Sequence, residues 1–237
     1  MRKFLVFLVL LLILLVVADR GLHAAAQSEI AKRVSAQYEL AAEPAVTIGG
    51  IPFLTQAVGG NYSEINIVTG AMNVGDVQLE RVDVTAYDVQ APLSELMSSA
   101  PQAVAGRAEA TVKLPYSELQ KRLPEGIVIN NEGGEPRMSG DLSLGGFSRP
   151  VSAGLDIEVQ GDSIAVTPVD VQIGETDLNL GGQVEQRLAV SLPIPRLPFG
   201  LAITGIEAKP GGVEVSAEAS DVQLIGGQEQ QGRAQQG

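Results

Sequence analysis

The sequence predicts an α+β fold, in which an amphipathic N-terminal helix precedes a long, strongly curved antiparallel β-sheet with one or two further short helices. Two observations lead to this prediction. Apolar residues recur about every four positions up to residue 40 and about every second position afterwards, which is the change from a helical to a strand period. Some strand segments also shift their apolar phase internally, which is typical of a bent sheet.

The chain begins with Met1-Arg2-Lys3 and an unbroken apolar run of 15 residues, Phe4–Ala18. Such a start is typical of a secretory signal peptide. The small residues Ala24–Ala26 offer a cleavage site that would leave Gln27 as the new N-terminus, and an uncleaved membrane anchor is the alternative. We therefore expect residues 1–23 to be a signal peptide or an anchor. The protein is expected in the cell envelope, outside the cytoplasm.

Residues 24–40 predict an amphipathic helix. Apolar side chains at every fourth position fall on one helical face, and charged and amide side chains cover the other faces. We expect this helix to pack on a sheet, because a helix on a membrane surface usually carries more Lys and Arg. The apolar face consists of Ala26, Ile30, Val34 and Tyr38, with Ala31 beside them.

The rest of the chain predicts a meander of antiparallel strands. In the clearest strand, 151–159, apolar residues alternate with small or acidic ones. A Gly-Asp turn follows at 161–162, and the alternation resumes at Ile164, which predicts a hairpin. Two further hairpins are expected around the Gly-rich turns at 131–134 and 210–212, and another strand at Asn61–Thr69.

Two segments change their apolar parity. In segment 77–84 the parity reverses at Glu80-Arg81, and in segment 164–173 it reverses across Pro168. A slip of one residue turns every following side chain to the opposite face unless a bulge absorbs it. Because bulges bend strands, these slips favour a curved sheet over a flat sandwich.

The remaining segments complete a single domain. A short helix is expected at Pro115–Leu123, since proline suits a first helical turn, and another turn or two at Pro92–Ser98. Leu192–Phe199 contains three prolines, so we expect it to be extended. The polar Gly/Gln-rich end, 226–237, predicts a disordered tail. No linker interrupts residues 24–225, which we interpret as one domain.

Composition excludes several functional classes. The formal net charge of −12 repels nucleic acid, so no nucleic-acid partner is expected. The chain has no cysteine, and its one histidine, His23, lies beside the possible cleavage site. This excludes catalytic sites of the Ser-His-Asp and Cys-His types and zinc held by His or Cys. We expect no enzyme activity, cofactor or metal. Aromatic residues make up 4% of the chain, which predicts an aliphatic interior.

The segment Val46–Gln56, VTIGGIPFLTQ, lies between the predicted helix and the first strand. An export segment, a helix and this V-x-I-x-G-x-P-F-L-T-Q pattern together resemble the actinobacterial LmeA-like phospholipid-binding family. The parity change at 77–84, the short helix near 115–123 and Leu197–Phe199 before a final hairpin fit the same resemblance. It spans about residues 4–225.

The resemblance implies a phospholipid-binding protein of the envelope with a tubular fold, in which the curved sheet rolls around the N-terminal helix and encloses an apolar groove. Its partners would be phospholipid and, through the N-terminal segment, the membrane. Candidates for contact with the lipid are Ile30, Val34, Ile51, Phe53, Leu54, Leu155 and Ile157. Candidates for holding the headgroup are Arg81, Arg107, Arg137 and Arg149, together with Lys113.

The motif also predicts a sharp corner between the helix and the sheet. Gly49-Gly50 allows backbone conformations and close approaches that other residues cannot adopt. Pro52 favours an extended turn, and Phe53-Leu54 would point inward. The sequence therefore assigns the motif a structural role at this corner before any direct role in lipid contact.

Two other functions stay open. A ligand-free scaffold of the envelope would have a closed, well-packed interior without a groove. A hydrolase or transferase acting on envelope glycolipids would need two carboxylates facing each other across a cleft. The carboxylates considered for such a pair are Asp83 and Asp88, or Asp170, Glu175 and Asp177.

Overall fold

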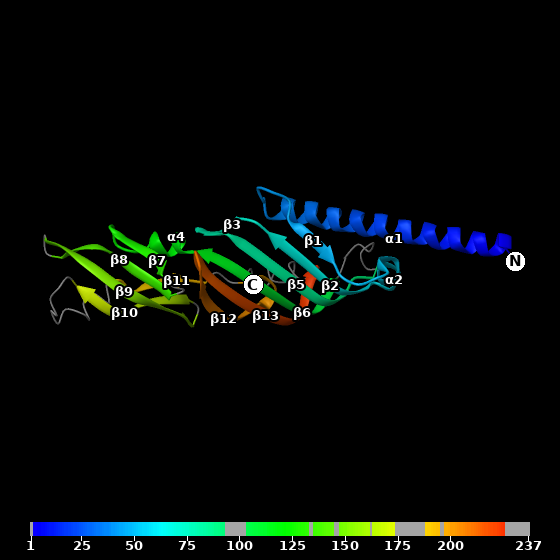
Figure 1. Ribbon diagram of the computed structural model, residues 1–237. Helices are drawn as coiled ribbons and strands as arrows, with labels where there is room; N and C mark the ends of the chain where they lie inside the picture. Colours follow the sequence, from blue (N-terminus) through cyan, green and yellow to red (C-terminus); the bar gives the residue numbers. More distant parts are fainter. Residues whose placement is uncertain are drawn as a thin grey trace, which may run out of the picture.

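The structure, a computed structural model, describes residues 2–92, 103–132, 135–144, 147–161, 163–173, 188–194 and 197–225. The molecule is elongated, with a long N-terminal helix beside a six-stranded sheet at one end and a five-stranded sheet at the other (Figure 1). The helices are α1 (Arg2–Gln37), α2 (Phe53–Gly59), α4 (Tyr116–Gln120) and the 3-10 turn η1 (Pro198–Gly200). The strands are β1 (Ala45–Ile48), β2 (Asn61–Thr69), β3 (Met72–Val74), β4 (Val77–Leu79), β5 (Arg81–Gln90), β6 (Ala103–Pro115), β7 (Ile127–Glu132), β8 (Glu135–Leu144), β9 (Phe147–Gln160), β10 (Ser163–Ile173), β11 (Val190–Pro193), β12 (Ala202–Lys209) and β13 (Gly212–Ile225).

The sheets are antiparallel, and the predicted α+β class is confirmed. The six-stranded sheet has the order β1-β2-β5-β6-β13-β12, and the five-stranded sheet has the order β11-β10-β9-β8-β7. The three predicted hairpins are confirmed as β7–β8, β9–β10 and β12–β13. The expected single sheet is divided in two, because Pro115 ends β6 and leads the chain into α4.

The two sheets share one hydrophobic core. Leu114 and Val213, from the six-stranded sheet, belong to the same buried cluster as Val151, Ala153 and Val166 from the five-stranded sheet. The helix α4 adds its own buried side chains to this cluster. The junction between the sheets is therefore a packed interior.

The six-stranded sheet curls along one line that crosses three neighbouring strands. At this line the sequence spacing between successive inward-facing residues increases from two to three in β5, β6 and β13. In β5, for example, it is three between Ala86 and Val89. Asp88 in β5 and Asp221 in β13 have left-handed backbones there, with φ of 52° and 53°. Gly106 lies between them in β6, where an added Cβ would stand 3.3 Å from the Cβ of Asp88. The pairing register continues across this line, so the three strands bend together.

The two predicted parity changes have different origins. The change at Glu80-Arg81 is a strand boundary: β4 ends at Leu79 and pairs with β3 in a separate hairpin, and β5 begins at Arg81. A bulge was the wrong interpretation at this position. The change near Pro168 is a true irregularity in β10, between Val169 and Gln172, with Asp170 left-handed at φ 53°.

The N-terminal helix is continuous and joins the apolar run Phe4–Ala18 to the amphipathic helix predicted at 24–40. Residues 2–37 form α1 without a break, and its predicted apolar face is half-buried at Ile30 and Val34. The helix packs against β1 and α2 along one edge of the six-stranded sheet (Figure 1), with only Asp19 and Ala31 buried. The sheet curls but does not enclose α1, because the apolar face on its C-terminal half is narrow and can cover only an edge.

Within α4, Glu118 is a buried carboxylate. Its residue is 1% exposed, and its Oε1 accepts a hydrogen bond from Lys121 Nζ at 2.5 Å. The Lys121 ammonium group, followed by a hydrogen bond from the backbone of Gln78 in β4, holds the pKa of Glu118 below its ordinary value, against the effect of burial. The buried carboxylate of Glu118 thus lies beside Gln78 of β4.

The left-handed backbone at Asp88 predicts a residue-specific stability effect. A β-branched side chain is disfavoured at positive φ, so Asp88→Val is expected to lower the free energy of unfolding by about 1–3 kcal/mol. Gln90→Val, on an exposed position of the same strand, should change it by less than about 0.5 kcal/mol. Urea unfolding measures both variants, and equal effects would contradict the assigned kink.

The lowered pKa of Glu118 predicts a loss of stability in acid. Because the folded pKa lies below the ordinary value of 4.5, the carboxylate stabilises the fold above about pH 4.5, and this contribution is lost as the pH falls through the folded pKa. Glu118→Gln should therefore destabilise the protein at pH 7, by about 1.5–3 kcal/mol. It should also make the stability of the protein less dependent on pH in the acid range. Thermal unfolding between pH 3 and 7 tests this, with exposed Glu125→Gln as the control; an unchanged acid profile in Glu118→Gln would refute the assignment.

Candidate functional site

The segment Val46–Gln56 builds a compact corner between β1 and β2. We call residues Gly49–Gly60, which include α2, the α2 tip. Gly50 has φ of 87° and Gly60 has φ of 67°, and a Cβ at Gly60 would stand 2.4 Å from the Cα of Pro92. Gln56 closes the corner, since its Nε2 donates to Gly49 O at 3.0 Å and its Oε1 accepts from Ser63 N at 3.2 Å. A corner is present, but it lies between two strands and not between the helix and the sheet, because Val46–Ile48 already belong to β1. It contains a helix, α2, that the sequence did not predict.

A carboxylate from α1 caps this helix. The N–H of Leu54, in the first turn of α2, donates to Asp19 Oδ1 at 2.7 Å. Asp19 is 5% exposed, and Arg20 lies 3.5 Å from its other oxygen. A carboxylate at a helix N-terminus satisfies a free backbone N–H and compensates the helix dipole. The cap is supplied by a residue 35 positions earlier in the chain.

His23, one turn after Asp19, makes a second contact with the same corner. Its Nε2 lies 2.9 Å from Ile48 O, so the Nε2–H tautomer donates a hydrogen bond there. Its ring lies 5.3 Å from the ring of Phe53, which in turn lies 6.2 Å from that of Tyr62. Sequence reasoning placed Asp19 and His23 in a leader segment. The signal that could have corrected this is their spacing of four, which continues the helical face formed by Gln27 and Ile30.

The inward face of the curled sheet is built mainly from alanine. These side chains come from β5, β6 and β13, are all buried, and are accompanied by half-buried Tyr62, Ile65 and Leu224. Small side chains on this face bring no polar atom into the interior. We call this set the alanine face: Ala86, Ala103, Ala105, Ala108, Ala110 and Ala217.

The residues predicted to contact lipid fall into two groups. Ile30 and Val34 on α1 lie half-buried on the helix that packs against the α2 tip, where Phe53 is buried and Leu54 half-buried. Ile51, in the same tip, is 78% exposed. Leu155 and Ile157 belong to β9 in the five-stranded sheet, at the other end of the molecule (Figure 1).

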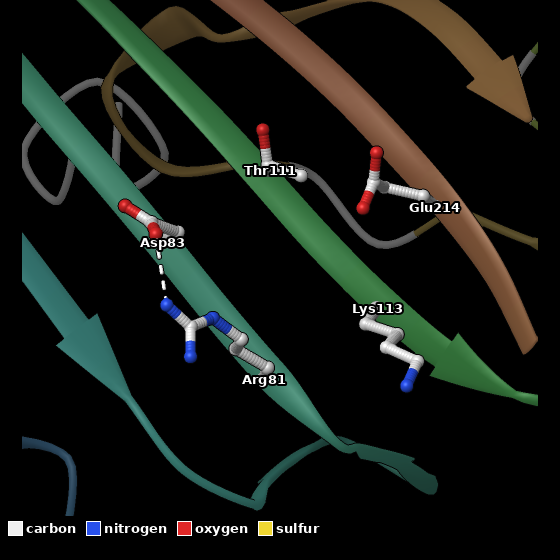
Figure 2. A pocket seen from close by; sticks show the side chains of 5 residues that line it. All are labelled: Arg81, Asp83, Thr111, Lys113 and Glu214. Carbon is white, nitrogen blue, oxygen red and sulfur yellow. Dashed lines mark hydrogen bonds and ion pairs between the residues drawn. The ribbon is translucent and has the colours of Figure 1, made fainter. Parts of the chain in front are cut away.

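Of the predicted headgroup residues, Arg81 lines a polar hollow formed on β5, β6 and β13 (Figure 2). Because side chains alternate along a strand, this hollow lies on the face opposite the alanine face. Its guanidinium lies 3.2 Å from Asp83, and Lys113 Nζ, also in the hollow, donates to Glu80 at 2.6 Å. Each positive charge thus already has a carboxylate partner. The hollow has a volume of about 200 Å³ and is lined by Arg81, Asp83, Thr111, Lys113 and Glu214.

The other three arginines do not converge with Arg81. Arg107 forms an ion pair with Glu109, lies 3.9 Å from Glu218 and stands over the ring of Tyr87 at 5.6 Å. Arg137 and Arg149 lie on β8 and β9 of the other sheet.

The carboxylates considered for catalysis are not paired in the described chain. Asp83 and Asp88 are five residues apart on β5, or about 17 Å along a strand, which exceeds the separation that a pair of catalytic carboxylates uses. Asp170 lies on β10, and Glu175 and Asp177 are outside the described residues. Within the part of the chain that the structure describes, no three His, Cys, Asp or Glu residues gather as a metal site would require.

Comparison with known proteins identifies one family. The model of the family described as "LmeA-like phospholipid-binding" matches residues 17–218. The match covers both sheets and includes the segment of α1 that carries Asp19 and His23. No curated protein and no solved structure matches the chain.

The cap on α2 predicts that Asp19 contributes to the stability of the domain. Asp19→Ala removes the acceptor for the Leu54 N–H and is expected to lower the free energy of unfolding by about 1–2 kcal/mol. Glu29→Ala, which removes an exposed carboxylate from the same helix, should change it by less than about 0.5 kcal/mol. Denaturant unfolding of the full chain in detergent distinguishes them, and equal losses would contradict the capping role.

Proposed function

Because the chain belongs to the LmeA-like phospholipid-binding family, we propose that it is a cell-envelope protein that binds a phospholipid and carries or presents it to envelope lipid assembly. The observation that carries the proposal is the family match over residues 17–218, which includes both sheets and their shared core. The structural features that follow support this function.

The acyl chains are proposed to lie against the alanine face. This surface is inward-facing and mostly aliphatic: its alanines are joined at the curl by the buried side chains of Val89 and Val222. Transfer of acyl chains from water to such a surface contributes about 0.8 kcal/mol per methylene group. At the end of the sheet beside α1, Ile30, Val34, Phe53 and Leu54 extend the apolar surface. Leu155 belongs to the packed core shared by the two sheets and Ile157 packs against it, so the proposal does not place the lipid on these two residues.

The protein is proposed to act on the outer side of the membrane. The apolar residues between Phe4 and Val17 are all exposed in the folded chain, and α1 is long and apolar enough to cross a bilayer. Arg2 and Lys3 precede this segment, and the positive-inside rule keeps them in the cytoplasm. The domain then follows on the outer face.

The mode of action is proposed to be binding without catalysis. Of the headgroup candidates named in the sequence analysis, Arg81, Arg107 and Lys113 form ion pairs with carboxylates of the protein. Because Arg81 and Lys113 lie on the face of the sheet opposite the alanine face, the proposal does not place the headgroup of a lipid bound there on these two residues.

Lipid binding is tested by native mass spectrometry of the full chain released from detergent, with organic extraction of the bound molecules. A mass increment in the phospholipid range is expected. Ala108→Leu places three additional carbon atoms on the alanine face; displacing about two methylene groups of the lipid would cost about 1.6 kcal/mol and reduce binding about tenfold. Ala202→Leu, at an exposed position on β12, is the matched control.

Three outcomes decide this test. A lipid-free wild-type chain that stays lipid-free after incubation with vesicles would favour the ligand-free scaffold. Undiminished lipid in a folded Ala108→Leu variant would move the lipid away from the alanine face. If Ala108→Leu does not fold, a phospholipid with a photoreactive acyl chain can label the wild-type protein, and cross-links to β5, β6 and β13 are then the expected result.

A further inference from the structure

The α2 tip lies at the point where α1 leaves the domain. The first half of α1 extends beyond the other described elements, and α2 packs beside the middle of the helix (Figure 1). The apolar run ends at Ala18, and the next residue, Asp19, is the one that caps α2. The end of the apolar segment and the α2 tip are therefore held at the same level along the helix axis.

The length of the apolar run places this level at the membrane surface. Fifteen helical residues, Phe4–Ala18, span about 22 Å, less than the ~30 Å thickness of a hydrocarbon core. A short span draws its flanking residues against the lipid headgroups. Arg20, whose side chain is 52% exposed, can reach phosphate groups from this position. The α2 tip, fixed to Asp19, is drawn to the same depth.

The amino-acid composition of the α2 tip suits a position at the membrane surface. No charged residue occurs between Pro44 and Ser63, in a chain in which 19% of residues are charged. Ile51 is 78% exposed and Val58 is 85% exposed, on either side of the capped first turn of α2. In water these apolar side chains are uncovered, whereas at the headgroup boundary they gain apolar contact without burying a charge.

We propose that α1 is retained as a membrane anchor and that the α2 tip inserts into the headgroup region of the leaflet from which α1 emerges. Cleavage after Ala26 would remove Asp19 and His23, the two residues that hold the tip to the helix. The family match also begins at residue 17, upstream of that cleavage site. The partner of this surface is the lipid bilayer itself, and the contact is independent of where a single lipid binds on the curled sheet.

The chain contains no tryptophan, so a single introduced one is a specific probe. Ile51→Trp and Val58→Trp place it on the tip, and Val128→Trp, at a 40% exposed position on β7, is the control at the far end of the molecule. Each full-length variant is reconstituted in nanodiscs of three parts phosphatidylcholine to one part phosphatidylglycerol. The phosphatidylcholine is either unmodified or brominated near the headgroup end of its acyl chains.

The tip variants are expected to emit at shorter wavelength than V128W and to lose fluorescence about twofold or more in brominated discs, while V128W is unchanged. Adding Asp19→Ala to V58W should reduce the quenching, and adding Glu29→Ala should not. Quenching in V58W no greater than in V128W would overturn the insertion. An intact mass from native membranes that begins at Gln27 would overturn the anchor. Lipid binding in the mass-spectrometric assay can persist in either case, so the two proposals fail separately.

Discussion

The hydrogen bond from the N–H of Leu54 to the carboxylate of Asp19 is the constraint on which the N-terminal half of the structure depends. A buried carboxylate needs a donor, because leaving it without one costs several kilocalories per mole. Here the donor is the free end of α2. The bond joins the end of an apolar segment to the corner between β1 and β2, and His23 reinforces the junction through Ile48. Helix, corner and sheet edge therefore form one unit.

A second constraint shapes the sheet. Three strands change their inward parity along one line, with a left-handed aspartate in β5 and in β13 and a glycine between them. Because the parity changes in all three strands together, inward side chains remain inward on both sides of the line. The sheet can therefore bend without breaking the backbone hydrogen bonds between its strands. The inward surface at this curl is formed by small and medium-sized apolar side chains, the alanines together with Val89 and Val222.

Sequence periodicity predicted the strands and hairpins of this fold well, because one face of each strand packs on a core. The three hairpins at 131–134, 161–162 and 210–212 carry both the two-residue alternation and a turn signal. The reversal at Glu80-Arg81 was misinterpreted, because a strand boundary and a bulge produce the same parity change in a sequence. The pairing partners of β4 distinguish them, and these are tertiary information.

The candidate site was less predictable. The motif at 46–56 pointed to a corner, but α2 within it escaped detection, since its seven residues end in Gly59 and its cap comes from α1. The kink at Asp88 leaves a trace in the sequence, because Ala86 and Val89 share a face at a spacing of three. The dipeptide Asp-Val does not by itself predict a kink, because Asp83-Val84 lies in a regular part of the same strand. Which arginines lie close together depends on the sheet to which each strand belongs. The residue pattern within a single strand does not contain this information.

The continuity of α1 would also set the mechanical coupling between the bilayer and the domain in the anchored protein proposed above. A glycine-rich tether would let the domain tumble through a volume set by its length, whereas a helix that runs unbroken from residue 2 to residue 37 transmits tilt and rotation. The residues after Asp19 form a stiff lever of about 28 Å. With α1 anchored as proposed, this stiff helix would hold the five-stranded sheet within a narrow range of heights above the lipid surface, so that a partner would meet it without a search along the membrane normal.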